Sequence, residues 1–455
     1  MIILKNGTEP TAIYYGNRPI KNVFVGTRLV WPAAIFFGIK SFGLCKTHAA
    51  FVLNNGTLWT TGSNRHGQLC RIAPSGTWNT PNLAPVPGVI DAVSVAVSCT
   101  EEEEGSTVVL REHSRLFSAG FSTSSRLAVT QSQKRAYTSL GRQSLSGNES
   151  FSNFGEALGL SGIRRIFHGR GQLIVERSTG VLYGYGLDWD ANRALLQWIP
   201  VRNSFGQNLI VRDLILHARN MAALHPDGSV GVAGPIADWF RPSSIPVQYQ
   251  VSFQPSATET FWTDMRKITA GQSHLAGITK AGFLRMAGSD QFGQLCSSRS
   301  RYRNPEQGVL FDDQSIQDVA CGAHHTVILY RNGHVKTGGL NHRGQLGRTV
   351  PVGNGHDWLY FSGKDRVSEE GWFGNSDEIP GISDATAVYA GGDMTMIFCK
   401  SGIYVCGDNE FGQLGTVTDR HIVNSDDRLA WRESWQGVRT SFETNLQSTA
   451  LFASP

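Results

Sequence analysis

Three histidines and one cysteine of this sequence are of the types that bind metal ions. His48, His274 and His325 each lie eight residues before a glycine, and Cys45 precedes His48 at a spacing that zinc ligands often have. A structural zinc site needs converging ligands, whereas these histidines recur at equivalent positions far apart in the chain. The sequence therefore predicts histidines that form structural hydrogen bonds, with no metal and no cofactor bound.

Four glycine-rich loops could cradle a phosphate group. They share the pattern Gly-x-(Asn/Asp)-x-x-Gly-Gln-Leu and span residues 62–70, 288–296, 339–347 and 407–415. A nucleotide-binding loop continues with Lys-Ser/Thr into a helix, and none of these loops does so. We expect the glycine to allow close backbone approach, the glutamine to bond to loop backbone groups and the leucine to fill the core.

No catalytic motif is present, because the sequence lacks a nucleophile elbow, a paired-carboxylate motif and His-Glu-x-x-His. The acidic run 101–104 is predicted to be a solvated loop, with binding of a cation or a basic partner as the alternative. A net charge of +4 over 455 residues does not favour nucleic-acid binding. The seven scattered cysteines predict reduced thiols, and the lack of a long apolar stretch predicts cytoplasmic synthesis without membrane insertion. We expect a protein that is not an enzyme.

A repeated unit positions these residues along the chain. The copies are strong in units one, five, six and seven and weak in units two to four. Each unit predicts a short apolar strand followed by a β-hairpin, with Asn55-Gly56, Asp227-Gly228 and Asn332-Gly333 as tight turns that need positive φ at both central residues. The turn positions are 48 to 69 residues apart and lie at residues 56, 114, 180, 228, 282, 333 and 402.

Repeats of this length and type predict an all-β fold, a seven-bladed β-propeller over residues 34–455. Residues 438–452 are similar to the opening half of a further unit that is cut off before its hairpin turn. Such a half-unit could close the ring by joining the chain ends. An eighth, composite blade is the alternative.

The series Gly-x-x-His, Asp/Asn-Gly and Gly-x-Asn-x-x-Gly-Gln-Leu-Gly resembles the repeats of the regulator of chromosome condensation family, over roughly residues 35–452. The resemblance implies a seven-bladed propeller. The best-known member of that family is a nucleotide exchange factor for a small nuclear GTPase, and the repeat also occurs in many unrelated interaction proteins.

The N-terminal segment holds a second, smaller repeat. Residues 13–20 and 23–30 each run from apolar residues through Gly, a polar residue and Arg to apolar residues, which predicts two small β-hairpins. Two such hairpins bury too little surface to be stable alone. The pattern resembles hairpin tags of bacteriophage tail and other virion proteins, which implies an anchor over residues 1–33. Its candidate contact residues are Tyr14, Tyr15, Arg18, Phe24, Arg28 and Trp31.

Most tryptophans lie in the insertions between repeats, which hold eight of the eleven. Tryptophan is common at the centres of binding surfaces, and loops on a rigid scaffold often carry recognition. The alternative for each one is packing against a blade edge. The candidates for partner contact are Trp78, Trp239, Trp262, Trp358 and Trp372.

Together these features predict a bacteriophage structural or adhesion protein located in the virion. Its partners would be other virion proteins, bound through residues 1–33, and a host surface protein or glycan, bound through the propeller loops. The first alternative is a regulator of a small GTPase with nucleotide exchange activity. The second alternative is a carbohydrate-binding propeller, which the tryptophans of the insertions favour.

Overall fold

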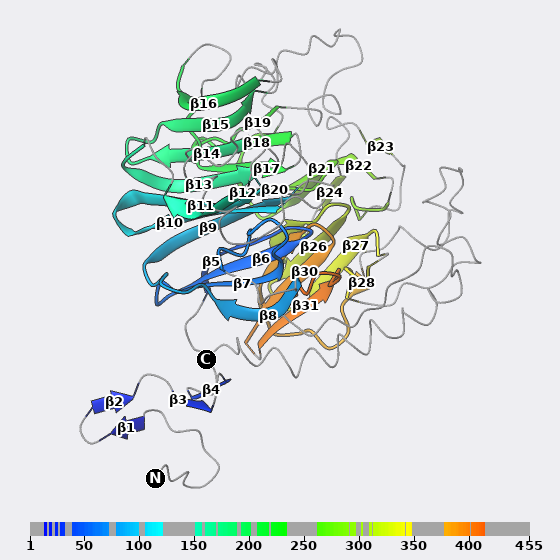
Figure 1. Ribbon diagram of the computed structural model, residues 1–455. Coiled ribbons are helices and arrows are strands. Elements are labelled where there is room, and N and C mark those ends of the chain that lie inside the picture. The colour runs from blue at the N-terminus through cyan, green and yellow to red at the C-terminus, as the bar shows by residue number, and fades with distance from the viewer. Residues whose placement is uncertain are drawn as a thin grey trace, which may run out of the picture.

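The computed structural model describes residues 13–15, 18–20, 23–25, 28–31, 39–71, 79–99, 105–121, 151–156, 160–169, 172–188, 193–201, 207–217, 220–233, 262–290, 292–296, 302–303, 309–311, 313–341, 343–347, 377–400 and 402–414. Within these ranges the chain forms seven antiparallel sheets of three to five strands, which follow one another as blades in chain order (Figure 1). The protein is therefore a seven-bladed β-propeller, as the repeat predicts.

The first four blades run from residue 39 to residue 233. Blade one contains β5 (Ile39–Leu44), β6 (His48–Leu53), β7 (Leu58–Ser63) and β8 (Asn79–Pro85). Blade two contains β9 (Ala92–Cys99), β10 (Gly105–Arg111), β11 (Arg115–Phe121) and β12 (Phe151–Glu156). Blade three contains β13 (Ile163–Gly169), β14 (Gln172–Arg177), β15 (Leu182–Asp188) and β16 (Arg193–Pro200). Blade four contains β17 (Asp213–His217), β18 (Asn220–Leu224) and β19 (Val230–Ala233).

The remaining three blades carry, together with blade one, the best-preserved repeats. Blade five contains β20 (Met265–Ala270), β21 (His274–Thr279), β22 (Leu284–Ser289), β23 (Tyr302–Arg303) and β24 (Val309–Phe311). Blade six contains β25 (Ile316–Cys321), β26 (His325–Tyr330), β27 (Val335–Gly339) and β28 (Asp377–Glu378). Blade seven contains β29 (Ala385–Gly391), β30 (Met394–Cys399) and β31 (Gly402–Gly407). The first strands of neighbouring blades contact one another, which makes them the innermost strands.

In blades one, three, four, five and six, the hairpin between the second and third strands turns at the predicted glycine, which has positive φ. The amide of Gly56 donates to the Leu53 carbonyl at 2.9 Å, and the amide of Leu53 donates to the Thr57 carbonyl at 3.0 Å. Gly56 has a φ of 78°, whereas Asn55 is not among the described residues with positive φ. The predicted turn with positive φ at both central residues is therefore wrong. The hairpin is a longer one, in which glycine alone takes the left-handed conformation and the Asn55 side chain accepts from the Thr57 amide.

The core lies between the blades, at interfaces that we call seams. Within the described residues, seven buried apolar clusters occur, one at each seam. The second strand of a blade packs on both neighbours, so all six residues of β6 and of β21 are buried. This double burial explains why these strands are apolar runs and do not alternate.

The ring closes because blade seven packs directly on blade one. Ala49 and Phe51 share a buried cluster with Met396 and Val405. Figure 1 shows the blue strands of blade one beside the orange strands of blade seven. No additional blade separates these two, so the composite eighth blade is not formed between them. Residues 438–452 lie outside the described residues, and their predicted role in closure stays a prediction.

The N-terminal segment forms the two predicted hairpins. Strand β1 (Ile13–Tyr15) pairs antiparallel with β2 (Arg18–Ile20), and β3 (Val23–Val25) pairs antiparallel with β4 (Arg28–Trp31). The side chains of these strands and the predicted domain boundary after residue 33 lie outside the description. Helix is limited, in the part of the chain that the structure describes, to one short turn over Glu112–Ser114, and no helix there has the length and apolarity to cross a membrane.

Candidate binding face and the seams that support it

The repeat histidines join neighbouring blades. Each is fully buried and uses Nε2 to contact a threonine hydroxyl on the second strand of the next blade. The pairs are His48–Thr107 at 2.8 Å, His274–Thr326 at 3.0 Å and His325–Thr395 at 2.9 Å. The predicted structural role of these histidines in hydrogen bonding is confirmed.

Each of these threonines also donates a hydrogen bond to a glutamine backbone carbonyl in the glycine-rich loop of the preceding blade. Thr326 Oγ1 donates to the Gln294 carbonyl at 2.7 Å, and Thr107 and Thr395 do the same with Gln68 and Gln345. A hydroxyl has one proton to donate, so the threonine must accept from the histidine and Nε2 must carry a proton. We call this arrangement the His–Thr–Gln relay. Within the described residues, no group of three His, Cys, Asp or Glu is arranged to hold a metal ion.

The loop glutamine and asparagine organise the glycine-rich loop as predicted. Gln345 Oε1 accepts from the Arg343 amide at 2.8 Å, and Asn341 Oδ1 accepts from the Leu346 amide at 2.9 Å. Equivalent bonds occur in the other three loops, with Asp290 in place of the asparagine in blade five. Leu346 is 1 % exposed, so it fills the core. The glutamine and asparagine side chains of these loops therefore bond to the loop backbone, as the repeat predicts.

The Gly-x-x-His turns and the glycine-rich loops lie at the same end of the propeller. Both connect strands at one end of an antiparallel blade, whereas the Asn-Gly hairpins lie at the other end. The turns also bond to one another between blades: the Gln272 amide donates to the Ala323 carbonyl, and the Ala323 amide to the Gly392 carbonyl. We call this end the turn face, and its solvent-accessible described side chains include Lys46, Arg65, Phe292, Arg343 and Glu410.

A buried carboxylate, Asp408, and a partly buried one, Asp393, underlie the charged side chains of the turn face. Burial raises the pKa of Asp393 and of Asp408, and the nearby Arg343 opposes this rise in both. Gln345 Nε2 donates to Asp393 Oδ1 at 3.3 Å. Arg343 also lies 3.7 Å from Glu410. This cluster presents both signs of charge at one place, which suits recognition of a charged protein surface.

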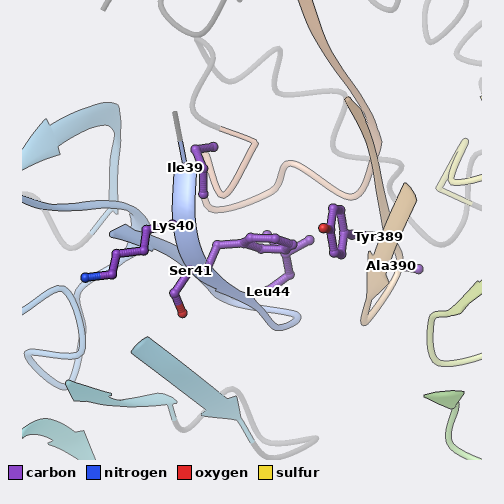
Figure 2. Close-up of a pocket in the computed structure, with 7 residues that line it drawn as sticks. Ile39, Lys40, Ser41, Leu44, Tyr389 and Ala390 are labelled. Atoms are coloured by element: carbon purple, nitrogen blue, oxygen red, sulfur yellow. The ribbon is translucent and has the colours of Figure 1, made fainter. Parts of the chain in front are cut away.

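A hollow of about 430 Å³ lies at the seam between blades seven and one (Figure 2). It is bounded by the innermost strands, β5 and β29. Phe42 and Tyr389 meet edge to face there, with ring centroids 4.2 Å apart. Figure 2 shows the Lys40 ammonium pointing away from Tyr389. The described lining therefore brings no set of reactive groups together.

The structure places only part of the predicted partner-contact residues. Trp262 is 3 % exposed and packs in the seam between blades four and five, where it pairs with Val230 as an isolated β-bridge. Its predicted role at a binding surface is corrected to core packing, because a buried ring cannot meet a partner. The side chains of the other candidates lie outside the described residues: Tyr14, Tyr15, Arg18, Phe24, Arg28, Trp31, Trp78, Trp239, Trp358 and Trp372. The acidic run 101–104 lies outside them too.

Comparison with known proteins supports a propeller of the regulator of chromosome condensation type. Residues 316–345 match the family model described as the Regulator of chromosome condensation (RCC1) repeat. The chain is 30% identical over 160 residues to the secretion-regulating guanine nucleotide exchange factor of Bos taurus, which is 34% of each chain. It is 32% identical over 151 residues to the regulator of chromosome condensation of Xenopus laevis, which is 28% of this chain and 33% of that protein. The matched segments thus span about a third of these relatives.

The likeness in structure extends around the ring. Prp20p of Saccharomyces cerevisiae, crystallised in a study of its binding to Gsp1p and histones, superposes with a TM-score of 0.61 at 17% identity. The alignment covers 79% of this chain and 82% of Prp20p. At that identity the likeness defines the fold: a seven-bladed propeller built from repeats of this type. The likeness of the N-terminal hairpins to virion tags stays a prediction.

Proposed function

We propose that this chain is a protein-binding propeller that regulates a small GTPase by promoting nucleotide release. The repeat at residues 316–345 and the named activity of the bovine relative support this function over the others. The turn face supplies a docking surface with both signs of charge, held on a rigid frame of interlocked turns. The observation that carries the proposal is the likeness to a named exchange factor, combined with a complete ring of blades.

The mechanism requires only differential binding. An exchange factor that binds the nucleotide-free GTPase more tightly than the nucleotide-bound form weakens nucleotide binding by the same factor. The propeller therefore needs no nucleophile, acid or base of its own. On the turn face, Arg343 and Glu410 can pair with charges of opposite sign on the partner, which steers association and fixes its orientation.

Nucleotide release from a panel of purified small GTPases tests this function. Each GTPase is loaded with fluorescent GDP, and release is followed with and without the full chain. We expect release from at least one GTPase to accelerate about tenfold or more. Arg343→Glu reverses a charge on the turn face and should reduce that acceleration by about tenfold.

Lys400→Glu is the matched control, because Lys400 is exposed at the hairpin of blade seven, at the opposite end from the turn face. It should leave the acceleration unchanged. A panel in which no GTPase responds would contradict the exchange function. Equal losses in the Arg343 and Lys400 variants would contradict the turn face as the docking surface.

A second candidate function is that of a bacteriophage virion protein anchored through its N-terminal hairpins. The observation that favours it is that β1–β2 and β3–β4 form as two consecutive hairpins, in the pattern on which the resemblance rests. The partner would then be another virion protein, and the propeller would face a neighbour or a host receptor.

Deletion of residues 1–33 separates the two functions. For a virion protein, the shortened chain should be lost from purified particles while the full-length chain is retained. For a GTPase regulator, the same deletion should leave nucleotide release unchanged. Incorporation of the shortened chain at the full-length level would contradict the anchoring function.

A further inference from the structure

The first position of the Gly-x-x-His turn differs in blade one. In blades five and six it is Gly271 and Gly322, and a Cβ at these positions would lie 2.2 Å and 2.0 Å from Cε1 of the turn histidine. In blade one the position is Cys45, whose Sγ lies 3.2 Å from Nδ1 of His48. A thiol thus stands beside the histidine of the relay at one seam, where the other two have no side chain.

The innermost strand of blade two brings a second thiol to the same place. A Cβ on Gly43 of β5 would lie 2.9 Å from Cγ2 of Val97 on β9, so these residues face each other across the seam. Two residues further on, Cys45 directly follows the end of β5 and Cys99 is the last residue of β9. The Cys45 amide continues the pairing of β5 with β6 by donating to the His48 carbonyl, so the alternation of side chains places Cys45 and Cys99 in the same seam cluster.

The contacts of the two cysteines agree with that alignment. Cys99 packs against the buried cluster that contains Cys45, and each of the two thiols shifts the pKa of the other. Thr47 Oγ1 lies 3.7 Å from the Cys45 sulfur. Cys45 is 7 % exposed, while Cys99 is partly exposed and offers a route from solvent.

The surroundings of the two thiols shift their pKa values in opposite directions. Burial raises the pKa of Cys45, but the hydrogen bond from Cys99 and the charge and hydrogen bond of His48 outweigh it, so the net pKa is well below the ordinary value. The pKa of Cys99 is raised by its hydrogen bond to Cys45 and by burial. Burial alone raises the pKa of the Cys70 thiol, and it raises the pKa of Cys406 to about 12.

We propose that Cys45 and Cys99 form a peroxide-reactive thiol pair that closes to a disulfide across the seam between blades one and two. Cys45 is the attacking sulfur, Cys99 is the resolving thiol and His48 is the positioning base. The resulting covalent link would join the innermost strands of the two blades.

The chemistry balances with hydrogen peroxide as the oxidant. The Cys45 thiol gives its proton to Nδ1 of His48, and the thiolate attacks one peroxide oxygen. The O–O bond breaks, a sulfenic acid forms, and the leaving hydroxide takes the proton from His48 to become water. The Cys99 sulfur then attacks the Cys45 sulfur, the S–O bond breaks, and the Cys99 proton leaves with the hydroxide as a second water. The two thiols together are oxidised by two electrons, and the peroxide is reduced.

Peptide mapping of the full chain after brief treatment with hydrogen peroxide and alkylation tests the pair. We expect a linked peptide that joins Cys45 to Cys99, formed about tenfold faster than Cys406 is oxidised. Cys99→Ser should stop the reaction at the sulfenic acid of Cys45, which dimedone traps. His48→Gln keeps an N–H donor for Thr107 but lacks the base, so the pH midpoint of Cys45 alkylation should move upward.

Two controls keep the test independent of folding defects. Cys45→Gly places in blade one the residue that blades five and six have at this position, so the fold should be retained while the rapid reaction is lost. Cys321→Ser removes a buried thiol whose pKa burial raises to about 12, and it should leave the reaction unchanged. The proposal fails if Cys45 and Cys99 stay fully alkylatable after peroxide, or if Cys45→Gly reacts as fast as wild type. Zinc bound to the isolated protein and lost in Cys45→Gly would also overturn it, because the thiols would then be metal ligands.

Discussion

The blades of the propeller fall into two arcs that are held together by different means. In the regular arc, formed by blades one, five, six and seven, the seams that follow blades one, five and six all use the His–Thr–Gln relay. In the irregular arc, formed by blades two to four, the polar contacts differ from seam to seam. This division matches the strength of the repeats in the sequence.

The irregular arc shows what can replace the relay. At the seam between blades two and three, Ser106 Oγ lies 2.7 Å from Nε2 of His168, which comes from the first strand of the following blade. At the next seam, Arg165 donates to the backbone carbonyls of Val211 and Arg212 and pairs with Glu176. Both arcs keep one apolar cluster per seam. The apolar contact is therefore the common requirement of the fold, and the relay is an addition at the seams that follow blades one, five and six.

The His–Thr–Gln relay also holds the loops of the turn face in place. Each relay ties the second strand of one blade to the glycine-rich loop of the preceding blade, which always belongs to the regular arc. This connection fixes the relative position of the loops that build the turn face. A rigid, preorganised surface loses less conformational entropy when a partner binds.

A side chain in place of a turn glycine should destabilise the regular arc more than the removal of a relay histidine does. Gly322→Ala places a Cβ 2.0 Å from Cε1 of His325 and 2.8 Å from the Gly392 carbonyl oxygen, so either the ring or the backbone must move. We expect a loss of about 3 kcal/mol in the free energy of unfolding, measured by chemical denaturation. Gly231→Ala in the irregular arc is the matched control, because its Cβ would meet only the tip of His225 at 3.3 Å. Equal losses would show that the turn is not tightly packed.

Removal of one relay histidine should lower the free energy of unfolding less than the glycine substitution does. It should lower it more than removal of a seam histidine in the irregular arc. His325→Ala deletes a fully buried ring and its hydrogen bond to Thr395, and we expect a loss of about 2 kcal/mol in the free energy of unfolding. His168→Ala removes a histidine that is bonded to Ser106 in the irregular arc and should cost less. A larger loss for His168→Ala would contradict the special role of the relay.

One carboxylate in each arc should make the free energy of unfolding depend on pH, and the two dependences should have opposite signs. Burial raises the pKa of Glu176, but the hydrogen bonds of Arg165 and Arg164 outweigh it and leave the net pKa lowered. Its stabilisation is present above the unfolded pKa of about 4.3 and is lost as the pH falls through the lower folded pKa. Asp408 has a pKa raised mainly by burial, so its contribution is favourable at low pH and is lost as the pH rises through the folded pKa.

Two variants test whether ionised Glu176 stabilises the fold while ionised Asp408 does not. At pH 7, Glu176→Gln should lower the free energy of unfolding by about 1 kcal/mol, and Asp408→Asn should leave it unchanged or raise it. Denaturation curves at pH 7 and at pH 4 give both values, and the effect of Glu176→Gln should shrink at the lower pH. A destabilising effect of Asp408→Asn at pH 7 would show that the ionised carboxylate is stabilising.

The sequence predicts those parts of the fold that depend on local spacing. The turn glycines, the buried histidines and the loop glutamines keep a constant spacing within the strong units, so their places in a blade follow from the repeat. The geometry of the Asn55-Gly56 turn was predicted less well, because a dipeptide does not distinguish a two-residue hairpin from a longer one.

The features that depend on contacts between blades could not be predicted. Cys45 and Cys99 meet because β5 and β9 are aligned through Gly43 and Val97, and no sequence pattern encodes that alignment. Arg343 and Glu410 come together from loops of different blades for the same reason. Trp262 lies in an insertion by the spacing of the repeats, yet it packs in a seam. A residue that lies outside the repeat can therefore still be part of the core.

Hydrogen–deuterium exchange of the full chain, with and without the GTPase that responds in the release assay, tests most directly whether the regular arc carries the binding face. We predict that binding slows exchange at the turns and loops of the turn face, around Lys46, Arg65, Phe292, Arg343 and Glu410. Exchange at the Asn-Gly hairpins of the opposite end should not change. Protection confined to those hairpins, or to blades two to four, would contradict the account.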